Sequence, residues 1–125
     1  MTSTIQALFV YGTLRPGEVR WQHLAPYVVG EGRDACVAGE LYDTELDYPA
    51  AMFGGDARIL GRIYSLDERQ LTDALAHLDE VEGAVRGLYA RVQVVTDAGE
   101  TAWAYQCGET ALLRTRIECG DWLQR

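Results

Sequence analysis

Short strand-like runs separated by glycine- and proline-containing turns occupy most of this chain, and one segment has clear helical spacing. Leu71, Leu75 and Leu78 recur at helical intervals and predict a helix. The strand-like runs, rich in apolar and β-branched residues, cover residues 5–10, 35–42, 59–64, 88–95 and 101–107. Because the connections are mostly short, this order of elements predicts an α+β fold with a curved or closed sheet.

Local signals predict where several of these elements begin and end. Ser65-Leu66-Asp67-Glu68 has the spacing of a capping box and predicts the start of the helix. The glycine pair in residues 54–56 predicts a turn before the strand at 59–64, and residues 97–100 predict a hairpin connection. A shorter helix is expected over residues 20–27. The segment after Gly108 fits more than one kind of structure.

Composition narrows the classes of function. At 125 residues the chain is expected to form one domain, residues 1–125. The formal net charge of -8 argues against nucleic acid or an anionic membrane as a partner, and favours a small molecule. All 11 basic residues are arginine, which excludes lysine-dependent chemistry. No apolar run approaches the length of a membrane span, so a cytoplasmic location is expected.

The cysteines and histidines carry no metal-binding pattern. Cys36, Cys107 and Cys119 are widely spaced and include no Cys-x-x-Cys, so neither a zinc site nor a disulfide framework is indicated. His23 and His77 stand alone, without a second ligand at helical spacing. We therefore expect no metal and no cofactor, and the residues give no signal for an oligomeric state.

The first strand-like run leads directly into a glycine turn. In Phe9-Val10-Tyr11-Gly12-Thr13-Leu14, Gly12 lets a ligand approach the main chain, and Thr13 adds a hydroxyl. Backbone amides in such a turn bind carboxylates and oxyanions. The alternative is an ordinary turn after a strand.

Glu82 is the one carboxylate that the pattern favours as an acid–base group. It follows the last apolar helical position and precedes Gly83. The partly negative helix end and the nearby Asp79 and Glu80 should favour its protonated form, as suits a base that later acts as an acid. The alternative is a solvated acidic helix end.

Four tyrosines and one arginine complete the candidate site. Tyr11, Tyr48, Tyr89 and Tyr105 lie near strand or loop ends and could offer hydroxyls to a ligand; Arg91 shares a strand face with Tyr89. Core packing for the aromatic residues and a surface ion pair for the arginine are the alternatives. No Ser-His-Asp, Cys-His or nucleotide-loop pattern is present, so the inventory suits proton transfer next to a reacting carbonyl.

Taken in order, these segments resemble the gamma-glutamylcyclotransferase-like family, in its gamma-glutamylamine cyclotransferase and avirulence-induced protein branch. The resemblance covers nearly the whole chain. It rests on a series of short motifs: Phe9-Val10-Tyr11-Gly12-Thr13-Leu14, Gly39-Glu40-Leu41-Tyr42, Tyr48-Pro49-Ala50, Gly61-Arg62-Ile63-Tyr64, Leu78-Asp79 with Glu82-Gly83, Leu88-Tyr89 with Arg91, and Ala102-Trp103-Ala104-Tyr105.

The resemblance implies a small mixed, mainly antiparallel β-barrel flanked by helices. It also implies a cofactor-free reaction in which the α-amine of a γ-glutamyl group attacks its own side-chain carbonyl, giving 5-oxoproline and releasing an amine or amino acid. Glu82 would move the proton, and the amides of Gly12, Thr13 and Leu14 would hold substrate oxygens. Two alternatives stay open: a metabolite-binding protein without turnover, and an interaction protein with an exposed apolar patch.

Overall fold

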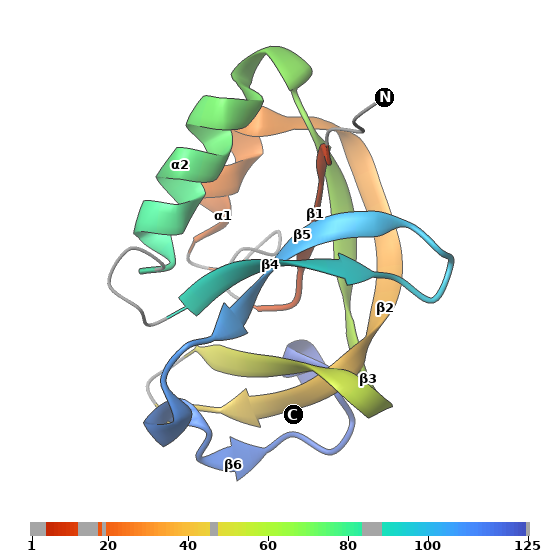
Figure 1. The fold of residues 1–125 in the computed structure, drawn as a ribbon, viewed down its shortest axis with the longest axis vertical. Helices are drawn as coiled ribbons and strands as arrows, with labels where there is room; N and C mark the ends of the chain where they lie inside the picture. Colours follow the sequence, from red (N-terminus) through yellow and green to blue (C-terminus); the bar gives the residue numbers. More distant parts are fainter. Residues whose placement is uncertain (1–4, 13–17, 19, 46–47, 84–88, 125) are drawn as a thin grey trace.

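The computed structural model describes residues 5–12, 18, 20–45, 48–83 and 89–124. These residues form one six-stranded sheet in the order β4-β5-β1-β3-β2-β6, with two helices beside it (Figure 1). The helices are α1 (Trp21–Leu24) and α2 (Leu71–Val81). The strands are β1 (Ala7–Val10), β2 (Val28–Asp43), β3 (Pro49–Leu66), β4 (Tyr89–Val95), β5 (Thr101–Cys107) and β6 (Thr115–Arg116). Single 3-10 turns are η1 (Ala25–Tyr27), η2 (Glu68–Gln70), η4 (Thr110–Leu112) and η5 (Trp122–Gln124).

The sheet is mixed and curled, as expected. β1 runs antiparallel to β3 and parallel to β5, and β4 and β5 form an antiparallel hairpin. At one point the curl brings the two sides of the sheet together: Val37 of β2 forms an isolated bridge with Thr96, and the Asp97 amide donates to the Cys36 carbonyl at 2.9 Å. The α+β class and the curved, mixed sheet are thus confirmed; where the resemblance implied a barrel, the sheet curls into a half-barrel beside two helices.

Two long strands, β2 and β3, provide the frame of the half-barrel, and they correct the turn predicted at residues 54–56. The register passes from Ala38↔Arg58 directly to Gly39↔Phe53, so residues 54–57 form a bulge within β3. Gly54 and Gly55 both have positive φ there. A glycine pair permits either a reversal or a bulge, and the continuous pairing with β2 on both sides selects the bulge.

The helix predicted from the leucine spacing is confirmed, but its predicted start is wrong. Leu71, Leu75 and Leu78 are buried on the face of α2 that packs inward. Ser65 lies within β3, where it pairs with Ala7 and Val29. Instead, Asp67 caps η2 by accepting a hydrogen bond from the Arg69 amide at 3.0 Å. Sheet pairing on both sides of Ser65 outweighs the local capping signal.

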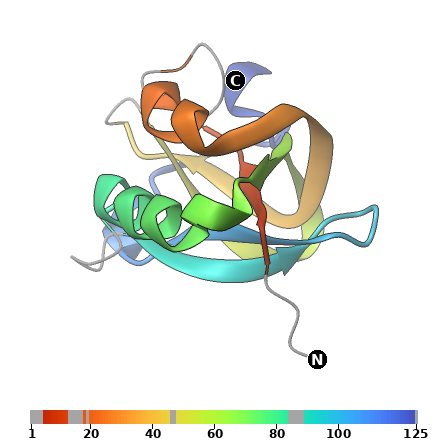
Figure 2. The ribbon, with the colours of Figure 1, turned by 90° about the horizontal axis from the view of Figure 1, so that it is seen from above.

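β1 is buried on both faces and separates two hydrophobic clusters. Leu8 and Val10 pack with Leu24 and the leucines of α2, whereas Phe9 and Tyr11 pack inside the half-barrel with Ile59, Ile63 and alanines of β5. Figure 2 shows α1 and α2 together on one side of the curled sheet. The expected helix over 20–27 is present as α1 followed by η1, with Leu24 fully buried. The end of β1 therefore lies where helices and half-barrel meet.

In the part of the chain that the structure describes, none of the helices has the length and apolar character needed to cross a membrane.

Candidate active site

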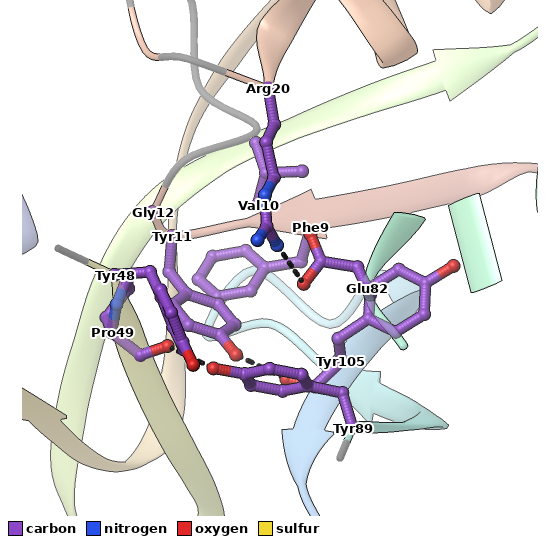
Figure 3. A pocket seen from close by; sticks show the side chains of 10 residues that line it. All are labelled: Phe9, Val10, Tyr11, Gly12, Arg20, Tyr48, Pro49, Glu82, Tyr89 and Tyr105. Carbon is purple, nitrogen blue, oxygen red and sulfur yellow. Dashed lines mark hydrogen bonds and ion pairs between the residues drawn. The ribbon is translucent and has the colours of Figure 1, made fainter. Parts of the chain in front are cut away.

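A pocket opens at the end of β1, between α2 and the strands. Its walls come from residues far apart in the sequence, which Figure 3 shows converging. The lining residues are Phe9, Val10, Tyr11, Gly12, Arg20, Tyr48, Pro49, Glu82, Tyr89 and Tyr105. Six of the predicted site residues are thus brought together: Tyr11, Gly12, Tyr48, Glu82, Tyr89 and Tyr105. Thr13 and Leu14 lie outside the described residues.

Glu82 enters the pocket from the C-terminal end of α2. The helix ends at Val81, and Glu82 caps it by donating its amide hydrogen to the Leu78 carbonyl at 2.9 Å. Gly83 then adopts φ of 74°, a left-handed conformation that stops the helix and that glycine adopts without strain. The Glu82 side chain, only 10% exposed, is held inside the pocket by this helix end.

Burial raises the pKa of Glu82 to about 7, and the Arg20 guanidinium opposes that rise. The direction agrees with the sequence-based expectation, but the cause differs. The expected cause was negative charge from the helix end, Asp79 and Glu80. Removal of the carboxylate from water is the dominant effect instead. Near neutral pH, Glu82 can therefore both accept and return a proton.

Three of the four pocket tyrosines use their hydroxyl protons within the protein. Tyr11 donates to the Tyr105 carbonyl, Tyr89 donates to the Pro49 carbonyl at 3.0 Å, and Tyr105 donates to Asp79 Oδ1 at 2.8 Å. Burial raises the pKa of all three hydroxyls. They stay protonated at neutral pH, and their rings form walls of the pocket.

Tyr48 differs from the other three. Within the described residues its hydroxyl makes no hydrogen bond to another protein group, so it is available to a ligand. Its ring packs edge-on against Tyr89, with ring centroids 6.2 Å apart. The guanidinium carbon of Arg20 lies 5.5 Å from the centre of the Tyr48 ring. Among the four pocket tyrosines, Tyr48 is thus the best candidate to contact a ligand through its hydroxyl.

Gly12 has a packing reason to be glycine. A Cβ atom at this position would lie 2.8 Å from Pro49 Cδ and would also overlap Cγ. The end of β1 and the start of β3 therefore approach each other more closely than a residue with a side chain at position 12 would allow. This close approach brings the Gly12 backbone into the pocket lining.

Arg91 is not among the described residues that line the pocket, so its role in substrate binding stays a prediction. Its guanidinium binds Asp79 through two hydrogen bonds, Nε to Oδ1 at 2.8 Å and Nη2 to Oδ2 at 3.2 Å. It also stacks over Trp103, 4.4 Å from the ring centre. The alternation of β4 puts Arg91 on the face of Tyr89, as expected, but its charge is taken up by the α2 carboxylate one turn before Glu82.

Arg20 is the pocket residue that sequence reasoning missed. Its Nη1 lies 3.5 Å from Glu82 Oε2, and its side chain is 29% exposed. Arg20 lies just before the short helix α1. Glu82 comes 62 residues after Arg20 in the sequence, so no local pattern links the two residues. The only signal was an arginine shortly after the glycine turn. Among the described residues, no group of three or more potential ligands could hold a metal ion.

The pocket encloses about 340 Å³ of space and opens to the solvent. In Figure 3 the Arg20 guanidinium points toward the Glu82 carboxylate, and both side chains line the pocket.

Comparison with known proteins places the chain in a family. The family model described as gamma-glutamyl cyclotransferase, AIG2-like, matches residues 8–124. A relative from Niallia circulans, named gamma-L-glutamyl-butirosin B gamma-glutamyl cyclotransferase, is 33% identical over 125 residues, covering 94% of this chain and 75% of the relative.

Two solved structures share the fold. An uncharacterized protein from Pyrococcus horikoshii has a TM-score of 0.73 at 23% identity, covering 97% of this chain and 92% of that one. An AIG2-like protein from Mus musculus has a TM-score of 0.61 at 21% identity, covering 87% and 80%. The chain therefore belongs to the gamma-glutamyl cyclotransferase, AIG2-like family and is an enzyme of that type.

Proposed function

We propose that this protein cyclises a γ-glutamyl group with Glu82 as general base and then general acid. The α-amine nitrogen of the substrate bonds to the γ-carbonyl carbon, and the bond from that carbon to the departing nitrogen breaks. The products are 5-oxoproline and a free amine or amino acid. The atoms and electrons of this reaction balance without water, an oxidant or a cofactor.

Glu82 carries the proton through this reaction. Its carboxylate takes a proton from the attacking amine and delivers one to the departing nitrogen, which cannot leave as an anion. Both steps need a group that is partly ionised near neutral pH, and a pKa of about 7 meets that need. Because the nucleophile is tethered within the substrate, the protein mainly has to fold the substrate into an attacking geometry.

The walls of the pocket suit this compact substrate. The rings of Tyr11, Tyr89 and Tyr105 and the side chain of Pro49 line the pocket beside Glu82, whose side chain is only 10% exposed. We assign the oxygen of the tetrahedral intermediate to backbone amides beginning at Gly12, whose main chain lines the pocket. Thr13 and Leu14 are included in that assignment from the family resemblance alone.

One observation supports the proposal most strongly: a single carboxylate, 10% exposed and with its pKa raised to about 7, lies in the pocket at the end of β1. Among the described lining residues, Glu82 is the only carboxylate. A structural ion pair would not need a carboxylate with its pKa near neutrality.

The test is to incubate the protein with a panel of γ-glutamyl amino acids and γ-glutamyl amines and to measure 5-oxoproline release. We expect turnover of at least one compound and a loss of about 10²- to 10⁴-fold in Glu82→Gln. Glu80→Gln, at the exposed neighbouring turn, is the matched control and should retain activity. Turnover that survives in Glu82→Gln would remove Glu82 from its role. Saturable binding with no turnover of any compound would favour a metabolite-binding protein instead.

A further inference from the structure

Arg20 is the only cation among the described residues that line the pocket. Within the described residues its guanidinium has one hydrogen-bond acceptor, Glu82 Oε2, at the long distance of 3.5 Å. A guanidinium carries five N–H donors in a planar fork that matches a carboxylate through two parallel bonds. Most of the binding capacity of Arg20 is therefore unused.

The Arg20–Glu82 contact is also a weak one for a fixed structural pair. It joins one nitrogen to one oxygen, whereas Arg91 and Asp79 make two bonds at 2.8 and 3.2 Å. Burial also raises the pKa of Glu82 to about 7, so its carboxyl group is incompletely ionised at neutral pH. An arginine with one long contact to such a partner can exchange it for a permanent anion.

We propose that Arg20 is the carboxylate-binding residue of this site, and that it leaves Glu82 and binds a carboxylate of the substrate when the substrate enters. This inference rests on the proposed cyclotransferase function. A γ-glutamyl compound always carries one carboxylate next to the attacking amine. When the departing group is an amino acid, it carries a second one close to the departing nitrogen.

The position of Arg20 suits either carboxylate, because Glu82 must contact both nitrogens. Each carboxylate lies one carbon away from one of those nitrogens. A group 3.5 Å from Glu82 is therefore within reach of both. Arg20 is also more exposed than Glu82, at 29% against 10%, so an incoming anion meets the guanidinium before the carboxylate.

Charge gives a second reason for the exchange. The chain carries a net charge of -8, which repels an anionic substrate at long range. Arg91, the other arginine among the predicted site residues, is paired with Asp79. Among the described lining residues, Arg20 alone remains to neutralise a substrate carboxylate. Its departure would also leave Glu82 without its counter-ion, and so make Glu82 a stronger base.

The experiment compares two substrates that differ by one carboxylate, γ-L-glutamyl-L-alanine and γ-L-glutamylethylamine. Arg20→Met removes the charge, Arg20→Lys keeps it without the fork, and Arg114→Met is the matched control. Arg114 also lies 3.5 Å from a carboxylate, that of Glu45, but is 61% exposed and outside the pocket lining. We expect Arg20→Met to raise KM about 10- to 100-fold, Arg20→Lys to recover part of the loss, and Arg114→Met to change neither value.

The two substrates distinguish the two carboxylates. An equal rise in KM for both compounds would support binding of the glutamyl α-carboxylate. A rise confined to γ-L-glutamyl-L-alanine would support binding of the departing group. A KM that is unchanged for both compounds in Arg20→Met would overturn the proposal, as would a loss of kcat alone.

A pH profile separates this role from a merely structural one. Because Arg20 lowers the pKa of Glu82, Arg20→Met should move the rising limb of kcat/KM to higher pH. If the wild-type protein turns over neither compound, the proposed function fails, and titration with L-glutamate tests Arg20 on its own. Weaker glutamate binding in Arg20→Met would support the carboxylate role, whereas equal or absent binding would overturn it.

Discussion

Two arginine–carboxylate pairs lie at the same end of α2, and they are built in opposite ways. Asp79 receives three hydrogen bonds, two from Arg91 and one from the Tyr105 hydroxyl, at 2.8 to 3.2 Å. Glu82, three residues later, receives one contact from Arg20 at 3.5 Å. The Asp79 side chain is 22% exposed and that of Glu82 only 10%. The more deeply buried carboxylate thus has the weaker partner.

This difference separates a structural carboxylate, Asp79, from the proposed acid–base carboxylate, Glu82. The Asp79 network joins α2 to β4 and β5 and offsets acidic charge at a helix end that has no basic residue in its last turn. It fixes the helix end from which Glu82 projects. Glu82 keeps the properties of an incompletely satisfied acid, with a raised pKa and a loosely held partner. One turn of helix therefore contains a carboxylate fixed by three hydrogen bonds and a second carboxylate, Glu82, for which we propose the acid–base role.

The largest expected effect is on the pH dependence of activity. In the proposed mechanism Glu82 must be ionised before it can accept a proton, and its pKa is about 7. The substrate α-amine titrates at higher pH, so its protonation state does not change below pH 7. We therefore expect kcat/KM to fall about tenfold for each pH unit below 7. Rates of 5-oxoproline release between pH 5 and 9 provide the measurement. In Asp79→Asn, kcat/KM should fall below pH 7 in the same way. If this fall shifts to another pH or disappears in that variant, the two carboxylates do not differ as described.

Removal of the anchor should affect stability most. Asp79→Ala leaves Arg91 without its carboxylate and the buried Tyr105 hydroxyl without its acceptor. We expect a loss of about 3 kcal/mol in the free energy of unfolding, measured by chemical denaturation. A loss below about 1 kcal/mol would show that the network is not an anchor.

Substitution of Glu82 should change the free energy of unfolding in the opposite direction to substitution of Asp79. Folding raises the pKa of Glu82, so the folded state holds its proton more tightly. The resulting stability is complete below the unfolded pKa near 4.5 and is lost as pH rises through about 7. Glu82→Gln avoids that loss but leaves Arg20 without its counter-ion, so we expect it to be more stable than wild type by about 2 kcal/mol at pH 8.

The same variant supplies its own control. Near pH 4.5 and below, Glu82 is protonated in the folded state, and the advantage of Glu82→Gln should vanish. Unfolding free energies measured across pH 4 to 8 give the comparison. A constant difference over that range would mean that Glu82 does not titrate with a raised pKa.

The smallest effect concerns the link between anchor and pocket. Tyr105→Phe removes one of the three hydrogen bonds to Asp79 but keeps the ring that lines the pocket. We expect a loss of about 1 kcal/mol in unfolding free energy and a change in kcat/KM of no more than a few-fold. A large loss of activity would instead make the hydroxyl part of the reacting site.

Features with a local cause could be predicted from the sequence. The leucine spacing of α2, the β4–β5 hairpin and the helix end before Gly83 each depend on neighbouring residues, and each is present. Glu82 could be singled out because it follows a helix directly and precedes a glycine. The direction of its pKa shift was right, although burial causes that shift.

Features that depend on distant pairing could not be predicted in the same way. Ser65 matched a capping box, yet sheet pairing with Ala7 and Val29 decides its conformation. The ion pair between Arg91 and Asp79 could not be predicted, because nothing in the sequence shows that the two residues meet across the fold. Arg20 was missed for the same reason, since its partner lies 62 residues away. The partners of charged groups are set by topology, which composition and periodicity do not encode.

The double burial of β1 bears on the order in which this protein assembles. The Tyr11 hydroxyl binds the Tyr105 carbonyl, 94 residues later, and β1 pairs with both β3 and β5. Contacts so far apart in sequence are slow to form, because the intervening chain must be ordered before they are gained. We therefore expect the end of β1 to reach its final place only after β5 is in position. The pocket would then be completed late in folding, and a chain that stops short of β5 would carry Glu82 without the Tyr105 wall beside it.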